Sequence, residues 1–308
     1  MPPKRIRGRP TSNSVRAVFQ PTDLTIQETT NKGKGVFTST PIPRGTRIIS
    51  EDPIITFPNI RTTYQVIDEV AKSTQENRDR FLSFGSSPSY VSAHPFMGIV
   101  QTNCVPMPER DRTGLFEIIC RMNHDCRPNA QYYWDDRLGK EVLYALRDIR
   151  AQEEITVSYS KDLNRVQRRA AILSAWAFSC QCPSCSLSPE ELVNSDKRIR
   201  QLTTIIDAVP MLLQTHPTVA LTKIRQAIII IEKEQLWNML SPQYSDAFQV
   251  CVAWSDLPNA KIWAERALEA RTRTHGPDCE AAAKMRAWME DPKSHSLWGV
   301  MGTRRLSS

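Results

Sequence analysis

Three cysteines lie close together in one short segment, at Cys180, Cys182 and Cys185. Thiolates at this spacing are typical of a metal-binding loop, and a structural zinc ion needs a fourth ligand to complete its tetrahedral geometry. That ligand must come from another part of the chain, so a zinc ion here would tie two distant segments together. A surface loop of reduced cysteines is the alternative interpretation.

The composition is that of an ordinary globular chain. Its 308 residues are 40% hydrophobic and 24% charged, which suffices for one large domain or two smaller ones with a buried core. No apolar run reaches the ~18 residues that span a bilayer, and the N-terminus lacks the apolar segment of a secretory signal. We therefore expect no membrane contact. Four scattered cysteines are expected to be buried free thiols in a reducing compartment: Cys104, Cys120, Cys251 and Cys279.

The positive charge is concentrated at the N-terminus. The net charge is +7, and residues 1–16 contribute +5 of it, which leaves about +2 (7 − 5) for the rest. We expect residues 1–16 to form a disordered basic arm. It contains Arg7-Gly8-Arg9-Pro10, the core of an AT-hook that would contact DNA in a narrow A·T minor groove. A nuclear-localisation signal and a solvated tail are the alternatives.

The chain changes character along its length. From about residue 18 to 58 the pattern predicts strands and turns, with Gly33 and Gly35 bracketing a tight turn. A helical insertion is expected at about 62–95. Further strands are predicted at 131–134, 141–145 and 155–157.

Beyond residue 190 the sequence predicts only helices. Apolar residues recur at helical spacing over 247–254 and 260–268, and Pro210 and Pro217 are expected to punctuate the earlier helices. Small and aromatic residues that face each other suit a tetratricopeptide-like hairpin, with a plain helical bundle as the alternative.

The pair Asn123-His124, the run from Glu153 to Tyr159 and the cysteine loop follow one another in an order and spacing that resemble a known family. They look like the C-terminal half of a SET domain with its post-SET segment, and the resemblance covers residues 30–186. It implies an α+β fold: a β-rich SET-type region with a pseudoknot and a helical insertion, a post-SET zinc segment, and an all-α, tetratricopeptide-like lobe.

The implied domain boundaries follow from this resemblance. They are a basic arm at 1–16, a SET domain at 17–160, a post-SET zinc segment at 161–190 and a helical lobe at 191–308. The insertion and the lobe look like the SMYD-type subgroup, and more closely like the fungal group named SET domain-containing protein 5. SMYD proteins usually carry a MYND zinc module. The first cysteine here is Cys104, so that module is missing.

The resemblance implies a protein-lysine N-methyltransferase that uses S-adenosylmethionine and acts on a histone tail or another protein lysine. We expect a monomer in the nucleus or cytoplasm. A catalytically weak SET scaffold that binds chromatin or protein partners is one alternative, and a zinc-dependent DNA-binding protein without a cofactor is another. The glycine-rich signature GxGxxG is absent, so a Rossmann-type methyltransferase is not supported.

The resemblance also implies which residues form the site. Tyr159 is the implied catalytic residue, since its hydroxyl would orient the incoming amine while an apolar channel favours the uncharged amine. The implied cofactor-binding residues are Lys32, Gly33, Lys34, Gly35, Asn103, Asn123, His124, Tyr159 and Phe178. The implied zinc ligands are Cys126, Cys180, Cys182 and Cys185. Four cysteines leave zinc no open position, so the ion would be structural.

Two residues carry further expectations. Core packing against Trp176 is the alternative role for Phe178. The glycine that usually precedes Glu-Glu in this family is Gln152 here. Glutamine disfavours positive φ, so we expect this turn to take another shape.

Overall fold

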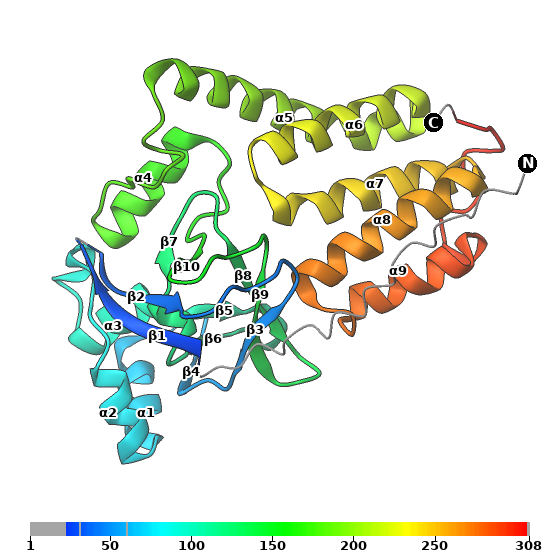
Figure 1. Cartoon of the computed structure of the whole chain (residues 1–308). Helices are drawn as coiled ribbons and strands as arrows, with labels where there is room; N and C mark the ends of the chain where they lie inside the picture. Colours follow the sequence, from blue (N-terminus) through cyan, green and yellow to red (C-terminus); the bar gives the residue numbers. More distant parts are fainter. Residues whose placement is uncertain (1–22, 31, 60, 307–308) are drawn as a thin grey trace, which may run out of the picture.

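The computed structural model describes residues 23–306 except 31 and 60. The basic arm predicted at 1–16 lies outside these residues. Within them, a β-rich region is followed by a lobe of helices that pack side by side (Figure 1). None of the described helices combines the length and the apolarity that a membrane crossing needs.

The β-rich region contains short strands in three small sheets. The strands are β1 (Leu24–Thr29), β2 (Gly33–Thr38), β3 (Arg47–Glu51), β4 (Ile55–Pro58), β5 (Val105–Met107), β6 (Arg112–Leu115), β7 (Asn123–His124), β8 (Ala130–Asp135), β9 (Lys140–Ala145) and β10 (Glu154–Val157). The sheet orders are β1-β2-β10-β7, β3-β9-β8 and β4-β6-β5. Strand β10 pairs antiparallel with β2 and parallel with β7, so segments far apart in the sequence meet along it.

Helices lie both inside this region and after it. The insertion carries α1 (Thr63–Lys72), α2 (Gln75–Leu82) and α3 (Pro95–Asn103), and α4 (Arg165–Trp176) follows β10. The lobe consists of α5 (Pro189–Thr215), α6 (Pro217–Lys233), α7 (Leu240–Ala253), α8 (Leu257–His275) and α9 (Glu280–Glu290). Short 3₁₀ helices are η2 (Pro88–Tyr90), η3 (Pro108–Arg110), η4 (Ile119–Arg121), η5 (Trp237–Met239) and η6 (Pro292–Ser294).

Both glycines of the predicted turn lie inside β2, so that prediction was wrong. The chain reverses before them, between Thr29 and Gly33. Gly33 has a φ of 68°, which glycine adopts without a steric penalty. Gly35 is required for a different reason, because a Cβ there would lie 2.6 Å from Glu154 Oε1.

The turn before β10 also differs from the prediction. Gln152 keeps the left-handed conformation, with a φ of 62°, and its N–H donates to the carbonyl oxygen of Thr38 at 2.7 Å. The expectation that glutamine would force another turn shape was therefore wrong. The hydrogen bond to β2 holds the turn in place, and the glutamine carries the strain of that backbone conformation.

A capping box and two prolines mark the first two helices of the lobe. Ser188 caps α5 in a capping box with Glu191, which satisfies free N–H groups at the helix start. Pro217 begins α6 as predicted, but Pro210 lies inside α5. Pro210 is exposed, while Ile205 and Val209 on the same helix belong to the lobe's buried core. This burial holds α5 together across the proline, so Pro210 does not end the helix.

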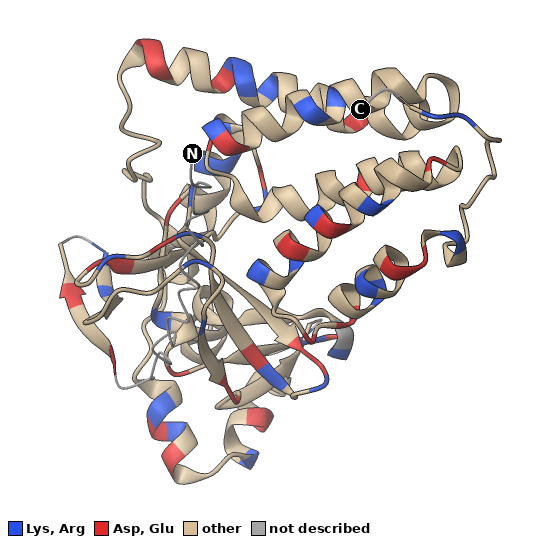
Figure 2. Cartoon of the chain, turned by 45° about the vertical axis from the view of Figure 1, so that its right-hand side comes forward, with Lys and Arg blue, Asp and Glu red and all other residues tan. Residues whose placement is uncertain are grey.

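Charged residues on the lobe are mixed in sign. Figure 2 shows basic and acidic side chains interspersed along its helices, without a face of one sign. The part of the lobe seen there therefore lacks the basic stripe that is typical of nucleic-acid binding.

Candidate functional site

Tyr159 lies just after β10, among aromatic and apolar neighbours. Its hydroxyl donates a hydrogen bond to the carbonyl oxygen of Met122 at 2.7 Å. Its ring centroid lies 4.8 Å from that of Trp176 and 5.4 Å from that of His124. Burial raises the pKa of Tyr159 above its ordinary value of 10. The phenol therefore stays protonated at neutral pH, and the group is suited to positioning a partner, not to removing a proton.

His124 joins Tyr159 to the cysteine cluster. Its Nδ1 accepts a hydrogen bond from the backbone N–H of Tyr159 at 3.0 Å, and its Nε2 lies 3.3 Å from the Sγ of Cys126. Burial lowers the pKa of His124 to about 4, so the ring is neutral at pH 7. Because Nδ1 accepts, the ring hydrogen must be on Nε2 and points to the sulfur. One imidazole thus fixes both the tyrosine backbone and a cysteine.

Glu154, which the sequence analysis did not assign to the site, links the predicted cofactor-binding residues Asn123 and Lys32, and Asn123 also contacts Lys34. Asn123 donates from Nδ2 to Glu154 Oε1 at 2.7 Å and to the carbonyl oxygen of Lys34 at 3.2 Å. Lys32 pairs with Glu154 at 3.4 Å. This network ties β2, β7 and β10 at one end of their sheet. The negative charge of Glu154 also holds one lysine cation beside Gly33.

Asn103 and Phe178, which were also predicted, make contacts outside this network. Asn103 ends α3 and donates to the carbonyl oxygens of Gly85 and Ile99 at 2.8 and 2.7 Å, so both of its amide hydrogens are used within the insertion. Phe178 is half-buried and packs against the cysteine cluster. Trp176 instead packs on Tyr159 and donates from Nε1 to the carbonyl oxygen of Thr102 at 2.9 Å.

The four predicted cysteines converge on one point. Cys126, Cys180, Cys182 and Cys185 are all buried, and their Sγ atoms lie within 4.8 Å of one another. The Sγ of Cys126 is 3.8 Å from that of Cys180 and 3.5 Å from that of Cys185. A regular tetrahedron with Zn–S distances near 2.3 Å has edges of about 3.8 Å. The donor set and its spacing therefore fit a structural zinc ion.

A positively charged side chain lies beside one of these sulfurs. Arg168 on α4 donates from Nε to the Sγ of Cys126 at 2.9 Å and from Nη1 to the carbonyl oxygen of Leu163 at 2.7 Å. A zinc ion with four thiolates carries a net charge of −2, so a nearby guanidinium would lower the cost of burying it. Sequence reasoning missed Arg168 because its helix reaches the cluster only through the tertiary fold.

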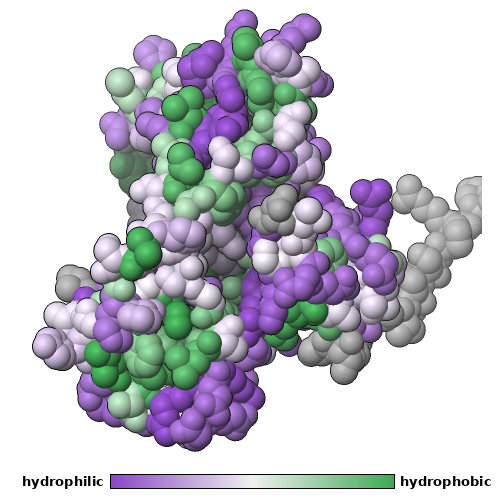
Figure 3. All heavy atoms as spheres, turned by 90° about the vertical axis from the view of Figure 1, so that its left-hand side faces the viewer, coloured by the Kyte–Doolittle hydropathy of each residue, from purple (hydrophilic) through white to green (hydrophobic). Residues whose placement is uncertain are grey.

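The surface is hollowed near this region. Figure 3 shows the recess between the helical insertion below and the part with α4 and α5 above. Large apolar side chains are exposed on elements of both sides, namely Leu82 and Val91 in the insertion and Val166 and Leu173 on α4.

The strand arrangement, the Asn-His pair, the tyrosine after β10 and the cysteine cluster together define a class of protein. The SET domain family model matches residues 33–160. This chain belongs to the SET-domain family of protein-lysine methyltransferases.

One relative extends the match beyond the SET domain, and others match over a shorter length. Histone-lysine N-methyltransferase set5 of Schizosaccharomyces pombe is 33% identical over 273 residues, which cover 87% of this chain and 83% of the relative. Histone-lysine N-methyltransferase ATXR2 of Arabidopsis thaliana is 40% identical over 75 residues, which cover 24% of this chain and 16% of the relative. Protein-lysine N-trimethyltransferase SMYD5 of Gallus gallus is 35% identical over 77 residues, with 24% and 18% covered. The similarity to set5 thus includes most of the helical lobe.

Proposed function

We propose that this protein transfers a methyl group from S-adenosylmethionine to a lysine side chain of a histone or another protein. The observation that carries the proposal is the position of Tyr159, whose hydroxyl is fixed on the Met122 carbonyl beside the Asn123-His124 pair. The family supports the same reaction. A histone substrate would imply that the protein acts in the nucleus, and another protein substrate would allow it to act in the cytoplasm.

The residues at the end of β2 fit the cofactor's amino-acid end. At Gly33 no atom lies within 4 Å of the position that a Cβ would occupy, so the backbone is open to a close approach. Lys32 and Lys34 flank it, and a cation would neutralise a carboxylate there. Asn103, Asn123, His124 and Phe178 are assigned to the same binding region. When bound, the cofactor supplies a methyl group activated by a sulfonium charge.

Tyr159 would position the lysine amine. Its hydrogen is donated to Met122, so the free lone pair of its oxygen can accept an N–H from the amine. This hydrogen bond would turn the nitrogen lone pair toward the methyl group. The core packed against Tyr159 is apolar, with Tyr132 and Cys120 also in contact with it. Such surroundings favour the uncharged, nucleophilic form of lysine.

The four cysteines would hold one zinc ion with no open coordination position. The metal would therefore act through structure, by fixing the segment 180–185 against Cys126 and the residue pair that precedes it. His124 extends this effect, since the same ring contacts Cys126 and supports the backbone of Tyr159. We assign residues 17–160 to the SET domain, 161–190 to the zinc segment and 191–308 to the lobe.

Two assays test the proposal. Calorimetry should show that S-adenosylmethionine binds, and transfer of a radiolabelled methyl group should mark histones or other lysate proteins on lysine. Binding without transfer to any protein would favour the alternative of a weakly active scaffold. Absence of binding by zinc-loaded, folded protein would refute the proposed function.

A further inference from the structure

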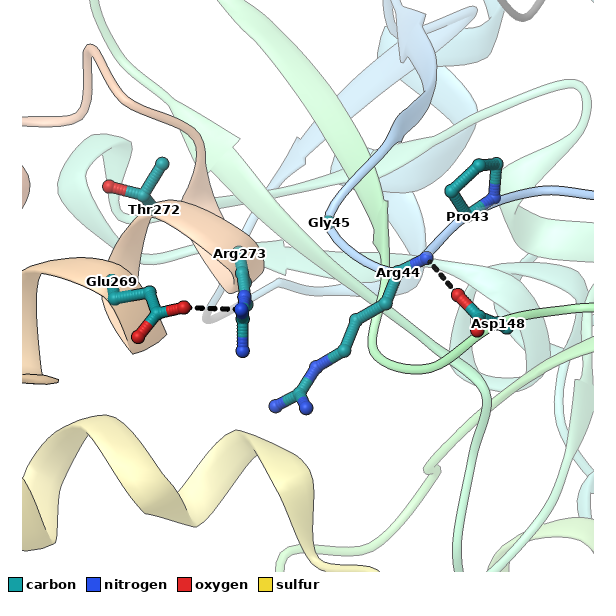
Figure 4. Close-up of a pocket in the computed structure, with 7 residues that line it drawn as sticks. All are labelled: Pro43, Arg44, Gly45, Asp148, Glu269, Thr272 and Arg273. Atoms are coloured by element: carbon teal, nitrogen blue, oxygen red, sulfur yellow. Dashed lines mark hydrogen bonds and ion pairs between the residues drawn. The ribbon is translucent and has the colours of Figure 1, made fainter. Parts of the chain in front are cut away.

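A cavity lies away from Tyr159, between the β-rich region and helix α8 of the lobe. Its volume is about 520 Å³. Figure 4 shows the side chains that line it: Pro43, Arg44, Gly45, Asp148, Glu269, Thr272 and Arg273. The first four come from turns beside β3 and β9, and the last three from α8. Both structural regions therefore contribute to one cavity.

Arg44 extends its side chain into this cavity (Figure 4). Its guanidinium lies 5.0 Å from the centroid of the Trp237 ring, and its Nε is buried without a hydrogen-bond partner in the described part of the chain. The carboxylate of Asp148 accepts from the backbone N–H of Arg44 at 2.7 Å and so serves the main chain. A buried N–H of this kind is normally hydrogen-bonded, because leaving it unpaired is costly.

Arg273 faces the same space from α8. It pairs with Glu269 one helical turn earlier. Its Cγ would lie 3.3 Å from a Cβ placed at Gly45, so α8 packs closely on the turn that carries Arg44. Burial lowers the pKa of Arg44, and the positive charge of Arg273 lowers it further. Glu269 and Asp148 act in the opposite direction. Two guanidinium groups from different regions thus share one cavity, and neither carboxylate that lines it accepts a hydrogen bond from the Nε of Arg44.

We propose that this cavity binds a single oxyanion group, a carboxylate or a phosphate, between Arg44 and Arg273. A guanidinium presents a planar fork of donors that matches such a group with two hydrogen bonds. Glu269 and Asp148 also line the cavity and would repel a ligand with several negative charges, which argues against a nucleic-acid strand. An anion here would contact the β-rich region and the lobe at once and would strengthen the contact between them.

The test is calorimetric titration of the whole chain at constant ionic strength in sodium chloride. The probes are inorganic phosphate and a blocked tripeptide with a central glutamate, with the glutamine tripeptide as the uncharged control. We expect saturable binding of at least one anionic probe and none of the glutamine peptide. Tighter binding of phosphate would identify a free anion as the ligand, and tighter binding of the glutamate peptide would identify an acidic protein side chain. Either outcome supports the site.

Four variants make the test specific. Arg44→Ala and Arg273→Ala should each weaken binding about tenfold or more, because each removes a charged donor pair. Lys261→Ala removes one charge from an exposed position of the same helix α8 and should leave affinity unchanged. Arg44→Lys keeps the charge, the stem and thus the fold while losing the fork, and should still weaken binding. Absence of saturable binding by the unmutated chain, or an affinity of Arg44→Ala and Arg273→Ala equal to that of the unmutated chain, would overturn the proposal.

Discussion

The region around Tyr159 and the helical lobe are built in opposite ways. The tyrosine region joins β2, β7, β10, the end of α4 and the cysteine loop, which are far apart in the sequence. In the lobe, each helix from α5 to α9 packs mainly on the next one along the chain. The chemistry is thus concentrated where distant segments meet, and the lobe provides a locally determined support. Long-range contacts make the site sensitive to single substitutions that the lobe would tolerate.

The largest difference between the regions should come from the metal. Cys182→Ser removes one zinc ligand, and binding of structural zinc supplies on the order of 10 kcal/mol in small zinc domains. We expect about one zinc per unmutated chain and none in the variant, measured by elemental analysis, with a lower melting temperature. Cys279→Ala is the control, since this buried cysteine lies near the start of α9, outside the cluster. A variant that retains a full equivalent of zinc would contradict the assignment.

The next effect concerns two tyrosine hydroxyls, one in the tyrosine region and one on β8 where that strand contacts the lobe. Tyr159→Phe should leave cofactor binding nearly intact and reduce methyl transfer about 10²-fold or more, in line with the loss of a positioning hydrogen bond in other active sites. Tyr133→Phe removes a hydroxyl that donates to the carbonyl oxygen of His275 at the contact with the lobe. It should change turnover less than about twofold, because that hydroxyl supports only packing. Similar turnover in both variants would remove Tyr159 from the mechanism.

A smaller effect should appear as a pH dependence of stability at the contact with the lobe. Burial lowers the pKa of His275 to about 4, below its ordinary value of 6.5. The unfolded chain then binds a proton more readily than the folded one, so stability is lost as the pH falls from 6.5 toward 4. At pH 5 the loss should reach about 2 kcal/mol. Denaturant unfolding at pH 7 and pH 5 would measure the difference in the free energy of unfolding between the two pH values. This difference should be smaller in His275→Phe than in the unmutated chain. It should be unchanged in the control His216→Gln, which replaces an exposed histidine.

The smallest expected effect is a gain in the stability of the fold. Gln152 holds a positive φ, and relief of that strain in Gln152→Gly should stabilise the fold by about 1 kcal/mol. Gln27→Gly in the exposed strand β1 is the matched control, and there glycine should destabilise by about 0.5–1 kcal/mol. Denaturant midpoints would measure both. Equal losses in the two variants would mean that the turn carries no strain.

The sequence predicted the elements better than the contacts between them. The helices over 247–254 and 260–268 follow from apolar spacing, because local burial decides them, and four cysteines suffice to predict a metal cluster. The roles of Glu154, Arg168 and the Met122 carbonyl could not be predicted, since these groups act through neighbours that only the folded chain provides.

The wrong predictions at Pro210 and Gln152 have the same cause. Pro210 and Gln152 each violate a local preference, and each is held in place by tertiary structure. Burial of Ile205 and Val209 keeps α5 continuous past the proline, and the hydrogen bond to Thr38 fixes the left-handed turn. Local rules therefore fail here where long-range packing opposes them.

The most direct measurement is X-ray diffraction at the zinc absorption edge, from crystals grown with S-adenosylhomocysteine. We predict one anomalous peak at about 2.3 Å from the four sulfur atoms of the cluster, and the product's sulfur facing the hydroxyl of Tyr159 beside the end of β2. An empty cluster, or a product molecule bound away from Tyr159 and Gly33, would contradict the account.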